Sequence, residues 1–297
     1  MLNSEIQGRW DGLSFRMTYI DKLRAASFAR NSLLCVGLDP DPKTIRGGLD
    51  GAVDFCRILI AATADVACCY KPNAAFWEQY GPAGWEALAT VRELVPSDIP
   101  VLLDCKRADV PGTMAAYATA VFDALEFDAA TVHAYHGVES LEAFTKYRTR
   151  GVYVVCHTSN PGRADLQHLR YGHKAVFVAV AEMAVRSGRA GNTGVVMGAT
   201  APHEAAVIRG RFPTLPFLLP GIGRQGGNVE AAVRASFTGD PVSCLIAVAG
   251  AIMYADDQRR SAIRWRDRIR RAAEGCRTLA EAQPNTVRAP GRSTRGR

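Results

Sequence analysis

Two carboxylates and an ammonium lie within six residues of one another in the segment VLLDCKRADVPGT, residues 101–113. The apolar run at 99–103 is typical of a buried strand. Asp104 and Lys106 stand at its C-terminal end, where alternation along a strand points both side chains to one face. Asp109 follows in the next loop. Because desolvating an ion costs several kcal/mol unless a partner compensates it, the segment is either an ion pair that closes a strand end or the charged centre of a reactive site.

The elements around this segment alternate regularly along the chain. Short apolar runs bounded by turn residues predict strands at 33–40, 64–72, 99–107, 129–135, 151–158, 192–200, 216–223 and 244–252. Stretches with helical patterning lie between them, for example at 51–63, 84–94, 113–125, 139–147 and 174–187. Eight strand–helix units over about 250 residues predict an α/β fold, a (β/α)8 TIM barrel. An open doubly wound sheet is the alternative, but no glycine-rich dinucleotide fingerprint follows the first strand.

Such a barrel would give the polar residues a common position, because barrels of this type carry their chemistry at the C-terminal ends of the strands. The residues at these predicted ends are Asp39, Lys71, Asp104, Lys106, Ser159 and Gln225. Independent structural ion pairs would have no reason to gather on one rim. The gathering therefore favours a reactive site.

Length and composition narrow the class of protein. The chain has 297 residues, of which 48% are hydrophobic, so it can bury a large core. We expect one barrel domain over 1–282 with an N-terminal helical extension, and a disordered basic tail over 283–297. No apolar run approaches the length of a membrane span, and the N-terminus lacks the layout of a signal peptide. We therefore expect a soluble cytoplasmic protein with no membrane partner.

The net charge of +7 raises the question of nucleic-acid binding. Much of the excess comes from arginines between residues 259 and 271, where Trp265 is the single aromatic residue. Surfaces that bind single-stranded nucleic acid offer several stacking aromatics. We therefore expect no nucleic-acid partner, and an anionic small-molecule substrate accounts for the charge equally well.

Cysteine and histidine usage suggests no metal centre. None of the eight cysteines forms a CxxC pair, so they are interpreted as buried free thiols, and strand parity turns Cys105 away from its charged neighbours. His133, His136 and His157 are interpreted as hydrogen-bonding scaffold rather than general bases. The sequence has no HExxH, P-loop or EF-hand pattern, so we expect neither a metal nor an organic cofactor.

Seven motifs in chain order resemble those of one known family. They are CVGLDPD at 35–41, YKPNAAFWEQYG at 70–81, LDCKRADVPGT at 103–113, TVHAYHG at 131–137, HTSNPGRADLQ at 157–167, GATAP at 198–202 and LPGIGRQGG at 219–227. From residue 15 to residue 255 the chain resembles the orotidine 5'-monophosphate decarboxylases, particularly the bacterial type with long loops. The resemblance implies conversion of orotidine 5'-monophosphate to UMP by a carboxy-lyase of pyrimidine biosynthesis.

The resemblance also implies roles for individual residues. Loss of CO₂ from C6 of the pyrimidine leaves a carbanion with little resonance relief, so the site must stabilise charge directly. Lys106 would stabilise and protonate this carbanion, beside Asp104 at the departing carboxylate. Lys71 and Asp109 would complete an alternating array. Further implied contacts are Asp109 and Thr113 reaching into the neighbouring site of a homodimer, Asp39 and Lys71 at the ribose hydroxyls, Ser159 at the pyrimidine edge and Gln225 at the phosphate.

The chain departs from the family pattern at one functional position. The family carries a Ser-Arg pair after the eighth strand, and its arginine clamps the substrate phosphate; here Ala249 and Gly250 stand in its place. Three explanations stay open. Arg224 supplies the missing charge; or the enzyme has diverged and acts on a modified or unphosphorylated pyrimidine nucleoside in a specialised pathway; or the protein is a non-catalytic nucleotide-binding relative. The retained charged array argues against the third.

Overall fold

The computed structural model describes residues 17–188, 190–223 and 225–282. At its centre lies an eight-stranded sheet with parallel pairing throughout. In spatial order its strands are β2 (Cys69–Lys71), β1 (Leu34–Gly37), β10 (Cys244–Val248), β9 (Phe217–Leu219), β8 (Thr193–Met197), β5 (Gly151–His157), β4 (Ala129–Val132) and β3 (Leu102–Arg107). Single bridges, Tyr70 to Val101 and Asn73 to Asp104, connect β2 to β3, so the two edges of the sheet meet. Each predicted strand range contains one of these strands, and the (β/α)8 TIM barrel is confirmed.

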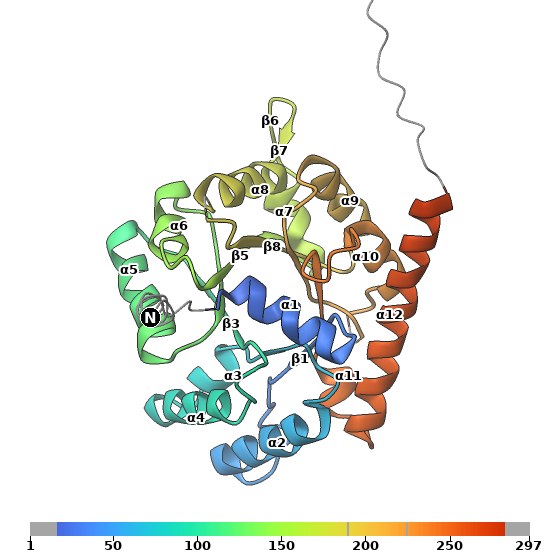
Figure 1. Cartoon of the computed structure of the whole chain (residues 1–297). Helices are drawn as coiled ribbons and strands as arrows, with labels where there is room; N and C mark the ends of the chain where they lie inside the picture. Colours follow the sequence, from blue (N-terminus) through green and yellow to red (C-terminus); the bar gives the residue numbers. More distant parts are fainter. Residues whose placement is uncertain (1–16, 189, 224, 283–297) are drawn as a thin grey trace, which may run out of the picture.

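Helices surround this barrel on the outside (Figure 1). They are α2 (Gly48–Thr63), α3 (Ala75–Glu78), α4 (Pro82–Glu93), α5 (Pro111–Thr119), α6 (Val138–Thr145), α7 (Ala164–Gln167), α8 (Val176–Ser187), α9 (Pro202–Arg211), α10 (Val229–Ser236), α11 (Gly250–Met253) and α12 (Gln258–Ala282). Parallel strands need such crossovers because each strand must return to the same end of the sheet before the next begins.

Helix α1 (Tyr19–Arg30) precedes the first strand and crosses the centre of the ring in Figure 1. The Tyr19 backbone N–H donates to the carbonyl of Thr149 at 2.8 Å, and its ring packs so closely on Gly151 that a Cβ there would lie 2.3 Å from it. Since Gly151 begins β5, α1 covers the N-terminal end of the barrel. The opposite end, where the strands finish, is left for a site.

Two apolar clusters separate the inside of the barrel from its outside. The inner cluster includes Cys69, Leu102, Tyr153 and Leu245, and α1 packs against it through Leu23. The outer, larger cluster fills the space between strands and helices. Alternation along each strand assigns side chains to one cluster or the other. Among the described residues the eight cysteines are free thiols, and all except the half-buried Cys276 are buried, as the sequence predicted.

Two predicted helices differ from the observed ones. The range 174–187 was expected to be helical throughout, but Lys174–Ala175 form strand β7, which pairs antiparallel with β6 (Arg170–Tyr171) in a small hairpin. The expected helix at 113–125 is α5 followed by a π-helical turn, Ala120–Ala124. Helical periodicity could not reveal the π-helical turn because its hydrogen bonds shift by a single residue. The strands β6 and β7 are two residues each, too short to show a period of their own.

The arginine-rich segment forms the long helix α12, and several of its guanidinium groups have acidic partners. Arg259 makes two hydrogen bonds to Asp65, at 2.7 and 2.8 Å, and Arg268 makes two to Glu230, at 2.6 and 2.8 Å. These pairs connect α12 to the segment just after α2 and to α10. The described residues contain no helix that is both long and apolar enough to cross a membrane. The predicted disordered tail, 283–297, lies outside the described residues.

Candidate active site

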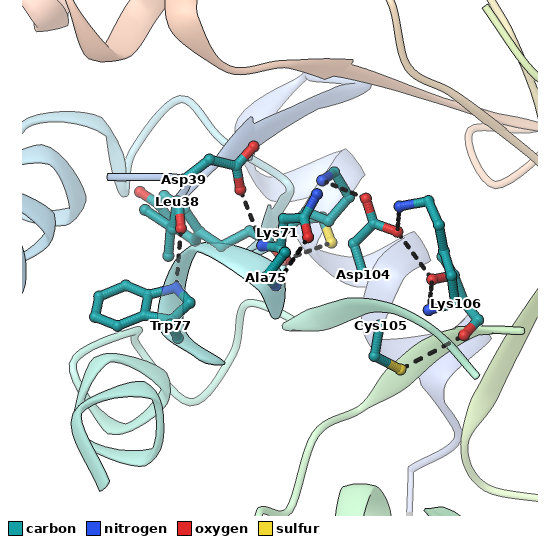
Figure 2. A network of polar contacts seen from close by, with 12 residues as sticks. Leu38, Asp39, Lys71, Ala75, Trp77, Asp104, Cys105 and Lys106 are labelled. Carbon is teal, nitrogen blue, oxygen red and sulfur yellow. Dashed lines mark hydrogen bonds and ion pairs between the residues drawn. The ribbon is translucent and has the colours of Figure 1, made fainter. Parts of the chain in front are cut away.

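Three charged side chains meet at the C-terminal ends of β2 and β3 (Figure 2). The Lys71 ammonium lies 3.1 Å from Oδ2 of Asp104, and the Lys106 ammonium lies 2.6 Å from Oδ1 of the same carboxylate. The hydroxyl of Thr131, on β4, donates to that Oδ1 at 2.9 Å. A single carboxylate is therefore held between two cations and a hydroxyl, which fixes its plane and leaves little rotational freedom.

The backbone of β3 is irregular where it carries these groups. Its pairing with β4 shifts register between Leu103 and Arg107, and Lys106 has a φ of 47°, in the left-handed region that non-glycine residues rarely adopt. The Lys106 N–H donates to the hydroxyl of Thr131 at 3.0 Å. Simple alternation had predicted that Asp104 and Lys106 point together; they do meet, but through this bulge rather than a regular strand.

Cys105, between the two, points away from them as predicted. Its thiol lies 3.5 Å from the carbonyl oxygen of Thr131, and it belongs to the outer apolar cluster. Burial raises the pKa of the Cys105 thiol to about 11. Because only the thiolate is a good nucleophile, this cysteine has no catalytic role near neutral pH.

Mutual attraction keeps the array ionised despite its burial. Burial by itself lowers the pKa of Lys71, but the charges of Asp104 and Asp39 outweigh it and raise the pKa above its ordinary value. Burial likewise pushes the pKa of Asp104 up, yet Lys71 and Lys106 hold it well below its usual range. The side chain of Lys71 is 6% exposed and that of Lys106 is 42% exposed. Lys71 is thus a fixed internal cation, whereas Lys106 faces the open space where a substrate would lie.

Asp39, which follows β1, lies beside this array, but burial outweighs the nearby cations in its effect on the pKa of this carboxyl group. Its carboxylate accepts the backbone N–H of Asn73 at 2.9 Å. Burial raises the pKa of Asp39, and the nearby Lys71 only partly opposes this. The indole of Trp77 donates to the carbonyl of Leu38 at 3.3 Å and anchors the chain just before Asp39 (Figure 2). Asp39 is therefore a carboxylate held in place by the backbone with an incomplete set of partners.

A second polar pair lies across the mouth of the barrel. The hydroxyl of Ser159, after β5, donates to Oε1 of Gln225, after β9, at 2.6 Å. Gly221 has a φ of 101°, and a Cβ at this position would lie 2.9 Å from that oxygen and 3.0 Å from Cβ of Ser159. Only glycine leaves room for this pair. The two loops are thereby joined over the barrel by side chains 66 positions apart.

A cavity of about 690 Å³ connects the charged array to the Ser159–Gln225 pair. Its floor is apolar, formed by Val155, Val196, Leu218 and Ala247 from the inner faces of four strands. An apolar floor with a few converging polar groups is the usual form of a small-molecule site. The volume falls within the range of about 300–1,000 Å³ that such sites have.

The structure brings together most of the residues predicted from the sequence. Those that line the cavity are Asp39, Lys71, Asp104, Lys106, Ser159, Gln225 and Gly250. Asp109 and Thr113 do not line it; Asp109 instead accepts the Val110 N–H at 2.7 Å. Arg224 lies outside the described residues.

Sequence reasoning missed three groups at the site. Thr131 links β4 to both Asp104 and Lys106. Asn73 holds Asp39, and the Tyr254 hydroxyl, half-buried beside the cavity, contacts the carbonyl of Asp39 at 3.2 Å and the N–H of Asp41 at 2.9 Å. Thr131 was detectable as a polar residue with inward parity in the fourth predicted strand. Tyr254 was not, because it reaches the first strand from the far end of the chain.

Known proteins match this chain over most of its length. The model of the orotidine 5'-phosphate decarboxylase / HUMPS family matches residues 32–264. The orotidine 5'-phosphate decarboxylase of Thermomicrobium roseum is 46% identical over 265 residues, which cover 87% of this chain and 94% of that protein. The solved structure of Leishmania donovani OMP decarboxylase has a TM-score of 0.80 at 42% identity, covering 87% of this chain and 100% of that one.

A longer protein also contains this fold. The structure of Leishmania donovani UMP synthase has a TM-score of 0.82 at 43% identity and covers 86% of this chain, while this chain spans 57% of its length. The match to the family model and the identity to curated relatives, both over most of the chain, lead to one conclusion. The chain belongs to the orotidine 5'-phosphate decarboxylase / HUMPS family.

Proposed function

We propose that this protein is a carboxy-lyase that converts orotidine 5'-monophosphate to UMP and CO₂. The observation that carries the proposal is the Lys71–Asp104–Lys106 array at one end of an apolar-floored cavity. Relatives 40–46% identical to this chain carry the name orotidine 5'-phosphate decarboxylase. Decarboxylation at an unactivated ring carbon needs preorganised charge rather than a nucleophile, and this array provides it.

The proposed reaction uses the two ends of the array differently. The C6–carboxylate bond breaks, CO₂ leaves, and the electron pair stays on C6 of the pyrimidine. The ammonium of Lys106, the more exposed cation, stabilises this pair and then transfers a proton to C6. Asp104, kept ionised by its two cations, lies against the departing carboxylate and orients Lys106. Asp39 and Lys71 hold the ribose hydroxyls, and Ser159 contacts the pyrimidine edge.

The phosphate end of the site is the part where this chain differs. Gly250, in the place of the family's arginine, lines the cavity at the start of α11. Gln225 and Arg224 are the proposed phosphate contacts, and for Arg224 the proposal rests on sequence position alone. The presence of Gly250 favours one alternative function, turnover of an unphosphorylated or modified pyrimidine nucleoside in a specialised pathway.

Turnover of two substrates separates these functions. We expect CO₂ release from orotidine 5'-monophosphate with kcat/KM far above that for orotidine, and its loss in Lys106→Ala. Lys22→Ala is the matched control, because it removes a Lys–Asp pair of similar length, 3.0 Å to Asp128, in α1 at the other end of the barrel. Turnover of orotidine alone would favour the nucleoside alternative. Tight nucleotide binding without CO₂ release would identify a non-catalytic binding protein.

The same two substrates test Arg224. If its guanidinium contacts the phosphate, Arg224→Ala lowers kcat/KM for orotidine 5'-monophosphate by about ten-fold or more, the effect of a lost charged hydrogen bond, and leaves any turnover of orotidine unchanged. Equal kinetics of variant and parent on the nucleotide would remove Arg224 from the site.

We also propose a homodimer in which Asp109 and Thr113 complete the site of the neighbouring copy. Thr113 is exposed and Asp109 half-buried, and next to them Val110 is 54% exposed, while Tyr135 after β4 is 82% exposed. Asp109 does not line the cavity of its own chain, and its carboxylate accepts the N–H of its neighbour Val110. Exposed apolar side chains after β3 and β4, together with a carboxylate that does not line its own cavity, fit a surface covered by a second copy.

Mixing inactive variants tests this dimer. Asp109→Ala and Lys106→Ala damage different sites of a shared dimer, so an equal mixture that exchanges subunits recovers about a quarter of the native sites. Lys71→Ala mixed with Lys106→Ala is the matched control and recovers nothing, because each chain then lacks its own residue. Recovery in neither mixture would contradict a shared site.

Other expectations remain proposals. The segment from residue 158 to 175, with its hairpin β6–β7, supports assignment to the long-loop bacterial type. We also propose one barrel domain over 1–282 with an N-terminal helical extension, of which residues 1–16 lie outside the described residues. We propose no nucleic-acid partner and a cytoplasmic location.

A further inference from the structure

Three side chains with metal-ligating chemistry meet behind the loop that follows β5. His157 is the last residue of β5, His168 follows α7, and Glu204 lies in the first turn of α9. The Nε2 atoms of the two histidines are 2.9 Å apart, and His168 Nε2 is 3.5 Å from Oε1 of Glu204. One ligand atom from each residue lies within 4.8 Å of the others. None of the three lines the cavity described above.

Hydrogen bonds between neutral imidazole rings cannot give every polar atom of His157, His168 and Glu204 a favourable partner. His157 is fully buried, and its Nδ1 has no hydrogen-bond partner. If His168 donates to His157, the proton of His157 must sit on that unpartnered Nδ1, which costs free energy. If His157 donates instead, the Nε2 of His168 accepts and carries no proton, so it faces the Glu204 carboxylate at 3.5 Å with no hydrogen bond between them. Each neutral tautomer therefore leaves one unfavourable contact.

A metal cation between the three groups would accept a lone pair from each of them, so no lone pair would face another. We propose that His157, His168 and Glu204 bind a divalent transition-metal ion, with Zn²⁺ the best match, at a site separate from the substrate cavity. Two imidazoles and a carboxylate form a common zinc donor set, and water would supply the fourth ligand. Tetrahedral bonds of about 2.0–2.1 Å put two nitrogens roughly 3.3 Å apart. His168, 40% exposed, can move outward by that small difference.

The surroundings both favour and oppose this ion. The ring of His157 is fully buried at the end of β5. The ring packs edge-on against Phe177, with centroids 5.5 Å apart, which fixes its direction. Arg163 is a nearby positive charge that disfavours a further cation. Arg163→Gln should therefore tighten binding.

A bound ion would join three separate segments of the chain. The side chain of Gln167 already accepts the Thr158 N–H at 2.9 Å and donates to the Thr158 hydroxyl at 2.8 Å. These bonds fold residues 158–167 back on the end of β5, and the ion would add a link to α9. Since Ser159 belongs to this segment, the metal would act as a clamp beside the site.

Metal titration of the tag-free protein tests the proposal, with Co²⁺ as the spectroscopic probe and Zn²⁺ as the competitor. We expect one Co²⁺ per chain with the intense visible bands of tetrahedral coordination, bleached by Zn²⁺, and a higher Tm with either ion. His168→Ala and Glu204→Gln should each weaken binding by more than about ten-fold. Both change partly exposed side chains, so they avoid the folding risk of altering the buried His157.

Matched controls are available nearby. His203→Ala removes the exposed residue next to Glu204 on α9, and His173→Ala removes an exposed histidine in the β6–β7 hairpin; both should bind as the parent does. Absence of tetrahedral bands would overturn the proposal. A thiolate charge-transfer band abolished by Cys276→Ser, or equal affinity in His168→Ala, would overturn it too.

Discussion

The ammonium of Lys106 lies 2.6 Å from the Asp104 carboxylate, although Lys106 holds a backbone conformation, φ 47°, that its side chain disfavours. A regular strand would not carry this conformational cost. It would also lack the irregularity between Leu103 and Arg107, where the Lys106 N–H donates to the Thr131 hydroxyl. Left-handed conformation in a non-glycine residue costs about 1–2 kcal/mol and is retained where the surroundings impose it. Lys106 is therefore both the residue with the strained backbone and the proposed proton donor.

Comparing Lys106→Gly with Lys106→Ala measures this strain. Glycine accepts positive φ, so the Gly variant should be about 1 kcal/mol more stable than the Ala variant. Both should lose at least about 10³-fold in kcat, since neither can deliver a proton. Chemical denaturation gives the stability difference, and an Ala variant as stable as the Gly variant would mean that the backbone is unstrained.

The coupling between Lys71 and Asp104 should appear in a double-mutant cycle. Lys71→Met leaves the buried Asp104 with a single cation and should cost about 3 kcal/mol, as the loss of one partner of a buried pair does. The double variant Lys71→Met/Asp104→Leu should be more stable than Lys71→Met, because Asp104 is then no longer a buried charge with one cation missing, and the partly exposed Lys106 remains solvated. Asp39 loses the charge of Lys71 in both variants, so its effect cancels in this comparison. Arg259→Met, at the exposed pair with Asp65, should cost less than about 1 kcal/mol. A double variant no more stable than Lys71→Met would contradict the coupling.

Asp39→Asn should stabilise the protein and impair turnover. Burial raises the pKa of Asp39 in the folded protein. Its contribution to the free energy of unfolding is therefore fully present at pH values below the unfolded pKa, about 3.9. That contribution is lost as pH rises through the higher folded pKa. Near neutral pH the ionised group destabilises the fold. The Asn variant should have the higher Tm there, with the gap closing in acid, while its kcat/KM falls about ten-fold or more through loss of a charged contact to the substrate. A lower Tm at neutral pH would count against this balance.

Gly221→Ala should separate the Ser159–Gln225 pair. The new Cβ would approach both side chains within about 3 Å, so we expect a raised KM with a smaller change in kcat. Gly239→Ala is the control, since its φ of 96° brings the same backbone strain but a Cβ there meets nothing within 4 Å. Both variants should lose stability, and only the first should change KM. If their KM values match, the pair does not contact substrate.

The order of elements and most of the site could be read from the sequence, because those features are local. Parallel strands show as continuous apolar runs, and a barrel places their ends on one rim, so Asp39, Lys71, Asp104, Lys106, Ser159 and Gln225 could be grouped before any contact was known. The π-helical turn after α5 could not be read in this way, because a single-residue change in hydrogen bonding leaves the hydrophobic pattern nearly unchanged. The hairpin β6–β7 could not either, because two-residue strands are too short to show a period.

Sequence alone determined which charges gather at the ends of the strands; tertiary structure decided how they act on one another. The bulge at Lys106, the hydroxyl of Thr131 and the reach of Tyr254 to the first strand depend on contacts between distant segments. The opposite shifts in the pKa values of Asp39 and Asp104 depend on which cations lie near each buried carboxylate. Charge interactions weaken with distance and strengthen with burial. The distances between these groups and their burial are set by the folded chain and cannot be read from the order of the residues.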